Sequence, residues 1–292
     1  MDALDQLAYL KTNNHFRINR VRKFSLVNIR QTTMEFIISV VLAVVVGLCD
    51  GQTTNYCDTS LCPNGGPHIA CNGLTTLSST CGAGSFEVTM NSTNQQLIVG
   101  LHNQLRSKVA SGQQVNRTGT YFKQAAKMAT LQWDTELANI AAANARRCVY
   151  GHDKCRNTAT MKYVGQNIAY QAYYGMSFTD NQLLSGFINS WFSEAENTTT
   201  QYLASYPSNY NGPAIGHFTQ IVSDRTSKVG CSMVSYVRSP FTYKYFVCNY
   251  GLTNIVNQPV YAAGNACSGC TTGCNANYPG LCSTAEVVKN NP

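Results

Sequence analysis

The sequence predicts an α+β domain that is cross-linked by disulfides. Apolar side chains recur at helical spacing over residues 97–109. Two β-strand patterns, Lys228–Arg238 and Tyr243–Tyr250, come only later in the chain. Helices that precede a late β-hairpin favour α+β layers over a doubly wound parallel sheet. Twelve cysteines follow residue 52 and can supply up to six cross-links.

Three helices are expected in the middle of the chain. The first stops before Gly112 and buries a stripe formed by Leu97, Ile98, Leu101, Leu105 and Val109. Asp134 is expected to cap the second helix, because its carboxylate can accept a free N–H of the first turn. The inner face of this helix would carry Leu137, Ile140, Ala141 and Cys148. The third helix is expected from Asn181 to Glu196, with Leu184, Phe187, Ile188 and Trp191 turned inward.

The two strands are separated by Ser239-Pro240, which predicts a turn. Cys231 and Cys248 would then lie on neighbouring strands, close enough to form a disulfide. We interpret the many tyrosines of the second strand as sheet packing rather than as a platform for a ligand.

Composition divides the chain behind its leader into three zones. Residues 52–90 are rich in Cys, Gly, Asn, Ser and Thr and predict a loop held by cross-links. Residues 91–256 carry the regular structure and form the predicted domain. Residues 257–292 form a second Cys-rich segment, which is too small for a hydrophobic core and must be held by disulfides.

The N-terminal region contains one strongly hydrophobic run, Phe36–Leu48, of 13 residues. A helix needs about 20 apolar residues to cross a bilayer, so the run is typical of a signal peptide instead. Residues 34–51 are predicted to be that signal peptide, with cleavage after Gly51. Residues 1–33 are interpreted as a gene-model extension or a long basic leader. The alternative is an uncleaved anchor whose basic tail stays in the cytosol.

The cysteine count predicts an extracellular location. Of 13 cysteines, Cys49 lies in the predicted leader. An even number then remains, which is typical of disulfides in a secreted protein: Cys57, Cys62, Cys71, Cys81, Cys148, Cys155, Cys231, Cys248, Cys267, Cys270, Cys274 and Cys282. Asn91, Asn116 and Asn197 each begin an N-glycosylation triplet, which supports the same prediction.

The net charge of +7 does not indicate a nucleic-acid binder. Residues 52–292 carry only part of that charge, and their Lys and Arg side chains are scattered along the chain. A nucleic-acid-binding surface gathers basic residues on one face. We therefore expect no nucleic-acid partner, and the shortness of the Phe36–Leu48 run predicts no stable membrane span.

Four segments carry a resemblance to a known family: Cys148–Cys155, Gly165–Ala169, Trp191–Glu194 and Gly216–Val222. In order and spacing they resemble the antigen-5 branch of the CAP superfamily, which includes cysteine-rich secretory, antigen-5 and plant pathogenesis-related proteins. The N-terminal pattern around Cys57 and Cys71 is similar to the start of mature insect antigen-5 proteins. The resemblance covers about residues 55–256.

The resemblance implies a three-layer α-β-α sandwich with two histidines and two acidic residues around one cleft. The histidines correspond to His152 and His217, and one acid corresponds to Glu194. The second acidic position is Gln166, which cannot act as a base. A further departure is Ser223, where the family motif usually has Trp, so the site is expected to be wider or filled differently there.

The resemblance also implies four disulfide bonds: Cys57–Cys71, Cys62–Cys155, Cys81–Cys148 and Cys231–Cys248. Three connectivities remain open for Cys267, Cys270, Cys274 and Cys282. The CxxC spacing of this last group could also hold zinc, but a secreted chain favours disulfides.

Two neutral imidazoles in a cleft are suitable ligands for Zn²⁺ or Cu²⁺. Glu194, on the inward side of its helix, could orient a metal-bound water or a histidine N–H. Catalytic zinc usually has three protein ligands, however, and the Gln166 position leaves a reduced acid–base set. Taken singly, His152 and His217 are also compatible with structural roles, as a loop residue and a strand-edge residue. His102 is interpreted as a core residue of its helix.

These observations favour a secreted, monomeric antigen-5-like protein that acts as a non-enzymatic extracellular effector or binding protein, of the venom, saliva or reproductive-fluid type, with allergen-like character. No cofactor is required for such a role. The first alternative is a metal-dependent hydrolase or redox protein that uses His152, His217 and Glu194. The second is a carrier of sterols or other lipids. The partner would be an extracellular protein or lipid.

Overall fold

The computed structural model describes residues 54–63, 65–289 and 291. The predictions for residues 1–33 and 34–51, including Cys49, lie outside the described residues. Residues from Thr54 onward belong to one compact unit. Within the described residues, no helix is both long and apolar enough to cross a bilayer.

The described α-helices are α2 (Ser92–Ala110), α3 (Thr135–Ala145), α4 (Asp180–Ser193), α5 (Thr200–Ala204) and α6 (Gly216–Ile221). The strands are β1 (Phe86–Val88), β2 (Met128–Ala129), β3 (Gln132–Trp133), β4 (Gly165–Tyr173), β5 (Lys228–Arg238), β6 (Phe241–Tyr250) and β7 (Leu281–Cys282). Three 3₁₀ turns, η1 (Thr59–Leu61), η2 (Ser79–Cys81) and η3 (Glu194–Asn197), complete the set.

The central sheet has the strand order β1-β5-β6-β4. A further strand, β3, also pairs with β5. All pairings along the main path are antiparallel, whereas β3 is parallel to β5. β5 and β6 form the predicted hairpin, with Ser239-Pro240 at its turn. Their register places Cys231 directly opposite Cys248, as their expected bond requires.

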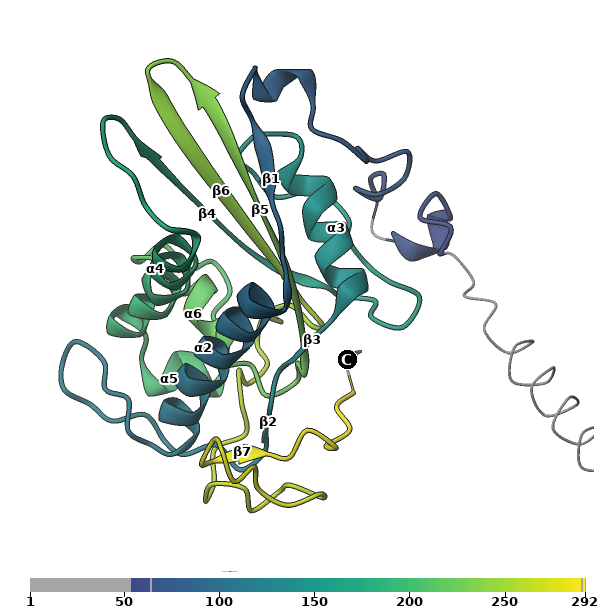
Figure 1. Ribbon diagram of the computed structural model, residues 1–292. Coiled ribbons are helices and arrows are strands. Elements are labelled where there is room, and N and C mark those ends of the chain that lie inside the picture. The colour runs from purple at the N-terminus through teal and green to yellow at the C-terminus, as the bar shows by residue number, and fades with distance from the viewer. Residues whose placement is uncertain (1–53, 64, 290, 292) are drawn as a thin grey trace, which may run out of the picture. The chain divides into compact units, whose positions relative to one another are not determined.

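Helices cover both faces of this sheet (Figure 1). α3 packs against β5 and β6 on one face, where a cluster of buried residues includes Ala141, Ile168 and Val247. α2, α4 and α6 lie on the other face over the larger cluster, which includes Trp191 and Phe246. The protein is therefore the expected three-layer α-β-α sandwich.

The helices begin where the sequence supplies side-chain caps. Asp134 Oδ1 accepts the backbone N–H of Leu137 at 2.9 Å, which confirms it as the cap of α3. Asn91 caps α2 in the same way through the N–H of Asn94. α4 begins with a reciprocal capping box between Thr179 and Gln182. Each cap satisfies an N–H group that has no partner inside its helix.

Gly230 explains how closely α3 lies on the sheet. A Cβ atom at this position of β5 would clash with the backbone of Asp134 and Ala138 at the start of α3. The absence of a side chain lets the helix backbone contact the strand directly.

Several element boundaries differ from those predicted. The third helix ends at Ser193, so Glu194 lies at its C-cap and begins a 3₁₀ turn. Cys148 lies beyond the end of α3, in a backbone conformation with φ of 52°. The N-terminal segment contains the short strand β1, whose pairing with β5 no local periodicity signals.

The largest missed element is β4. Its first four residues, Gly165–Ile168, are buried in succession because helices cover both sides of the sheet. A strand buried on both faces lacks the alternation of polar and apolar residues that identifies a half-exposed strand.

Six disulfides cross-link the described residues. Four are the pairs implied by the family resemblance: Cys57–Cys71, Cys62–Cys155, Cys81–Cys148 and Cys231–Cys248. The tail uses Cys267–Cys274 and Cys270–Cys282, one of the three connectivities left open by the sequence. β7 of the tail pairs with β2, so the tail is part of the same compact unit.

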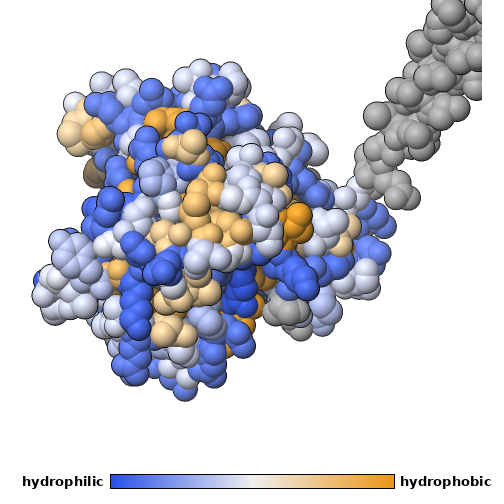
Figure 2. Space-filling view, turned by 90° about the horizontal axis from the view of Figure 1, so that it is seen from below, coloured by the Kyte–Doolittle hydropathy of each residue, from blue (hydrophilic) through white to orange (hydrophobic). Residues whose placement is uncertain are grey.

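The face of the molecule around β7 and the tail has a mixed surface (Figure 2). Apolar residues form small areas there, separated by polar ones.

Candidate functional site

The first half of the candidate site is built on His152, in the loop after α3, and on Gln166 of β4. His152 Nδ1 lies 2.7 Å from Gln166 Oε1. The Gln166 amide nitrogen donates to Asp153 Oδ2 at 2.8 Å and to Asn249 Oδ1 at 3.0 Å. Because both of these partners are acceptors, they identify the nitrogen end of the Gln166 amide, so its oxygen points toward the His152 imidazole. His152 therefore carries its proton on Nδ1 when neutral.

The second half joins His217, at the start of α6, to Glu194 at the end of α4. Glu194 Oε1 accepts a hydrogen bond from His217 Nδ1 at 2.6 Å. Glu194 Oε2 accepts the backbone N–H groups of His217 and Phe218, at 2.8 and 3.1 Å. The indole of Trp191 stacks on the His217 ring with 5.9 Å between centroids. His217 is thus held on a short helix, not at the strand edge that we considered from the sequence.

Consecutive residues of β4 connect the two halves. Gln166 contacts His152, and Asn167 Nδ2 donates to the His217 carbonyl at 3.1 Å. Within the described residues, neither imidazole Nε2 makes a hydrogen bond, so both remain available for another partner.

The surroundings of His152 favour its neutral form. Partial loss of hydration lowers the pKa of its imidazole, although the hydrogen bond with Gln166 opposes this. The nearby positive charge of Arg156 also lowers the pKa of His152. A neutral imidazole is the form that binds a metal ion.

The donor set fits a weakly held metal ion. Each histidine has its Nδ1 fixed by an oxygen acceptor, which is how metal-binding histidines are usually oriented. The described residues contain no group of three or more His, Cys, Asp or Glu side chains that could hold a metal. Two nitrogen ligands are fewer than catalytic zinc sites normally use.

The residues that orient this pair were not predicted from the sequence. Asp153 is buried and receives the amides of Gln166 and Asn144 and the guanidinium of Arg156. Its position beside His152 was the available signal. Asn249 and Asn167 could not be predicted as site residues, because their place at the site depends on how the strands pair.

Other sequence predictions fall outside this site. His102 is fully buried, with Nδ1 2.8 Å from the Ile98 carbonyl and Nε2 2.9 Å from Tyr250 Oη, so it belongs to the core. Ser223 is also buried, and its carbonyl accepts from the buried Arg106 guanidinium at 2.7 Å. The position that usually holds an indole in the family is therefore closed in this protein, and the site is not wider there.

Comparison with known proteins places this geometry in a family. Residues 99–250 match the model of the cysteine-rich secretory protein (CAP) family. Venom allergen-1 of Aedes aegypti is 45% identical over 247 residues, covering 85% of this chain and 93% of the relative. Venom allergen 5 of Dolichovespula arenaria is 38% identical over 212 residues, covering 71% of this chain and 98% of that protein.

Solved structures agree with the sequence relatives. NaASP2, crystallised with Zn²⁺, superposes with a TM-score of 0.57 at 29% identity, over 66% of this chain and 97% of NaASP2. BmVAL-1 superposes with a TM-score of 0.56 at 26% identity, over 66% of this chain and 95% of BmVAL-1. The chain therefore belongs to the CAP family and, within it, is similar to the insect venom allergens.

Proposed function

We propose that the protein is a secreted effector that binds an extracellular partner and has no catalytic turnover of its own. The observation that carries this proposal is the use of Glu194. Its two oxygens accept three hydrogen bonds, one from the His217 ring and two from the α6 backbone. A carboxylate held in this way is a positioning group and is poorly placed to take a proton from a substrate.

The half of the site around His152 supports the same proposal. Gln166 occupies the second acidic position, and its amide is engaged with His152, Asp153 and Asn249. An amide has no accessible proton-transfer chemistry at neutral pH. The insect relatives are named as venom allergens, which fits an extracellular role.

The test compares wild-type protein secreted from insect cells with the double variant His152→Gln/His217→Gln. Glutamine keeps side-chain polarity but removes both imidazoles. Hydrolysis of peptide, ester and phosphoester substrates is measured with added Zn²⁺, with and without chelator. Saturable binding of labelled protein to tissue cells is measured in parallel, and circular dichroism checks the fold.

We expect no chelator-sensitive hydrolysis and the same dissociation constant for cells with both proteins. Turnover that is present in the wild type and lost in a folded double variant would contradict the proposal. Loss of cell binding in that variant would place the effector activity in the cleft instead.

A second candidate is metal binding at the same histidines. It is favoured by the two free Nε2 atoms and by the similarity to NaASP2, which was crystallised with Zn²⁺. His152 and His217 would hold the ion, while Gln166 and Glu194 would keep the two rings in place. When bound, Zn²⁺ or Cu²⁺ would supply Lewis acidity or redox chemistry there.

A further inference from the structure

A concave site that is lined by neither His152 nor His217 lies between α2, the β2–β3 segment and the C-terminal tail. It is a groove of about 530 Å³, within the range of small-molecule sites. α2 contributes one face from its first turn onward, including Gln96 and Gly100. Trp133 of β3 and Tyr278 of the tail also line it.

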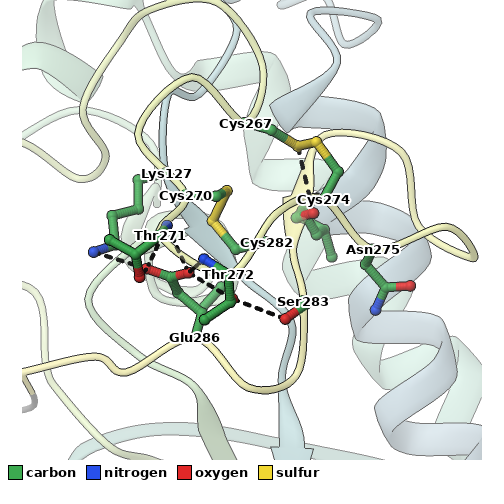
Figure 3. Close-up of a disulfide and its surroundings, with 12 residues drawn as sticks. Lys127, Cys267, Cys270, Thr271, Thr272, Cys274, Asn275, Cys282, Ser283 and Glu286 are labelled. Atoms are coloured by element: carbon green, nitrogen blue, oxygen red, sulfur yellow. Dashed lines mark hydrogen bonds and ion pairs between the residues drawn. A yellow bond between two sulfur atoms is a disulfide. The ribbon is translucent and has the colours of Figure 1, made fainter.

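The tail forms one wall of this groove, and the protein holds that wall firmly. Cys267–Cys274 and Cys270–Cys282 cross-link the tail internally (Figure 3). The buried Glu286 carboxylate accepts from the backbone and hydroxyl groups of Thr271 and Thr272 and pairs with Lys127 at 2.9 Å. The tail lies beyond the residues that match the family model, so the wall is an addition to the common domain.

Every residue that lines the groove is uncharged. The lining combines apolar surface with amides and hydroxyls: Ser92, Gln95, Gln96, Val99, Gly100, Asn103, Thr130, Leu131, Gln132, Trp133, Asn275, Asn277, Tyr278 and Thr284. The absence of a lining cation argues against a carboxylate, phosphate or sulfate ligand, which would lose its hydration without gaining a counter-ion.

Two aromatic rings and several free polar groups give the groove its recognition chemistry. Trp133 and Tyr278 are each half-buried, so part of each ring is available to a ligand. A Cβ atom on Gly100 would lie 3.8 Å from Tyr278 Oη, so the tyrosine hydroxyl lies beside α2 at this position. Aromatic surfaces and convergent neutral polar groups together suit a ligand that has both apolar faces and many hydroxyls.

Some of the lining amides are already engaged, and others are free. Asn103 is held by the backbone of Leu131, and Asn275 donates to Thr130. Among the described residues, the side chains of Gln96 and Asn277 and the hydroxyl of Tyr278 make no hydrogen bond to protein. These lining groups therefore keep unused donors and acceptors.

We propose that this groove binds a neutral oligosaccharide. Sugar rings present apolar C–H faces that stack on Trp133 and Tyr278, and their hydroxyls exchange hydrogen bonds with the free amides. The site does not depend on the proposed function of the histidine cleft.

The saccharide has two conceivable sources. One is a separate glycan, and the other is a glycan attached to this chain at Asn91, directly before the groove residue Ser92. Asn91 is exposed, and its Nδ2 makes no hydrogen bond to another described residue. The Nδ2 atoms of Asn116 and Asn197, in contrast, donate to the carbonyls of Thr198 and Ala214.

Intrinsic fluorescence offers a direct readout, because the chain has only two tryptophans. Trp191 is buried at 3% exposure, whereas Trp133 lines the groove. The full-length secreted protein is titrated with chitotriose and maltotriose, and with a heparin hexasaccharide as the anionic probe. Calorimetry measures the same affinities independently. We expect a saturable change in Trp133 emission with at least one neutral trisaccharide, in this protein or in the unglycosylated variant described below, and none with heparin.

Three variants test where binding occurs. Tyr278→Ala should weaken binding about tenfold, since it removes a stacking ring, while Tyr278→Phe should retain most of the affinity. Tyr174→Ala is the control, because it removes a tyrosine ring that is 66% exposed and lies outside the groove, in the β4–α4 loop. Equal affinities for Tyr278→Ala and the control would overturn the proposal, as would binding of heparin alone.

Thr93→Ala distinguishes the two sources, because it removes the glycosylation triplet at Asn91 and leaves the Asn91 cap of α2 in place. If the attached glycan occupies the groove, the wild type should not respond to added trisaccharide, and the deglycosylated variant should. If the ligand is a separate glycan, both proteins should bind. Absence of binding in both proteins would overturn the proposal.

Discussion

Glu194 and His217 form a fixed pair, with Glu194 Oε1 2.6 Å from the imidazole Nδ1. The second oxygen of the same carboxylate accepts the two N–H groups that begin α6. One side chain thereby sets both the orientation of the ring and the start of the helix that carries it.

Glu194→Gln should destabilise the fold by about 1–3 kcal/mol. The variant can still accept from His217 Nδ1, but its NH₂ group would face the N–H groups of His217 and Phe218. Urea unfolding at pH 7 measures the difference. Glu196→Gln is the matched control, since Glu196 is exposed two residues away and should change stability by less than about 0.5 kcal/mol. Equal stability of the two variants would refute the structural role of Glu194.

Gln166→Glu should also destabilise the protein at neutral pH, by roughly 1–3 kcal/mol. Gln166 Nε2 lies 2.8 Å from Asp153 Oδ2, so a carboxylate there would place two negative charges together. The pair would raise the pKa of the new carboxyl. The loss of stability should therefore shrink as pH falls from 7 to 5 and the carboxyl takes up a proton.

The measurement for Gln166→Glu is urea unfolding at several pH values between 5 and 7. Gln171→Glu, five residues along β4, serves as the control because Gln171 is half-buried at the outer end of the strand. A penalty independent of pH would show that Asp153 does not interact with the new charge.

His102 should make the fold sensitive to acid. Burial lowers the pKa of its imidazole from 6.5 to about 4. A depressed pKa in the folded state means that stability is present above pH 6.5 and is lost as pH falls toward 4. Protonation of His102 over this range lowers the free energy of unfolding by roughly 3 kcal/mol.

The difference in unfolding free energy between wild type and His102→Gln, followed from pH 7.5 to 4.5, isolates this effect. The substituted glutamine has no titrating group, so the variant should lack this part of the pH dependence even if it is less stable throughout. Parallel pH curves would contradict the prediction.

Glu286→Gln should loosen the C-terminal tail. Burial alone would raise the pKa of this carboxyl, but Lys127 and the hydrogen bonds from Thr272 and Thr271 hold it far below its ordinary value. The stabilisation by this ionised carboxylate is therefore fully present above the pKa that Glu286 has in the unfolded chain. It is lost only at strongly acidic pH. Hydrogen exchange of residues 267–289 should accelerate in the variant at pH 7 and stay slow in the wild type at pH 4. Unchanged exchange in Glu286→Gln would show that the disulfides alone hold the tail.

Zn²⁺ should bind weakly, and either His152→Gln or His217→Gln should abolish measurable binding in calorimetry. Because the pKa of His152 is below its ordinary value, this ligand should stay neutral and competent to below pH 6.5. Removal of metal by chelator should leave the melting temperature unchanged, since disulfides hold the fold. Binding that survives both substitutions would place the metal elsewhere.

Much of the architecture could be predicted from local patterns. The stripe of α2, the Asp134 cap of α3 and the β5–β6 hairpin are signalled by residues close together in sequence, because capping and amphipathic periodicity are local effects. Strand β4 was not signalled, since its first four residues are buried in succession and show no alternation.

By itself, the sequence supplied the candidates His152, Gln166, Glu194 and His217, through motifs that resemble those of the CAP family. Only the tertiary structure decided that Glu194 is used as a clamp on α6, that Asp153 and Asn249 orient Gln166, and that the tail closes a groove against α2. The reason is physical. Residue type limits which bonds a side chain can form, but the choice among partners depends on distances between segments far apart in the chain.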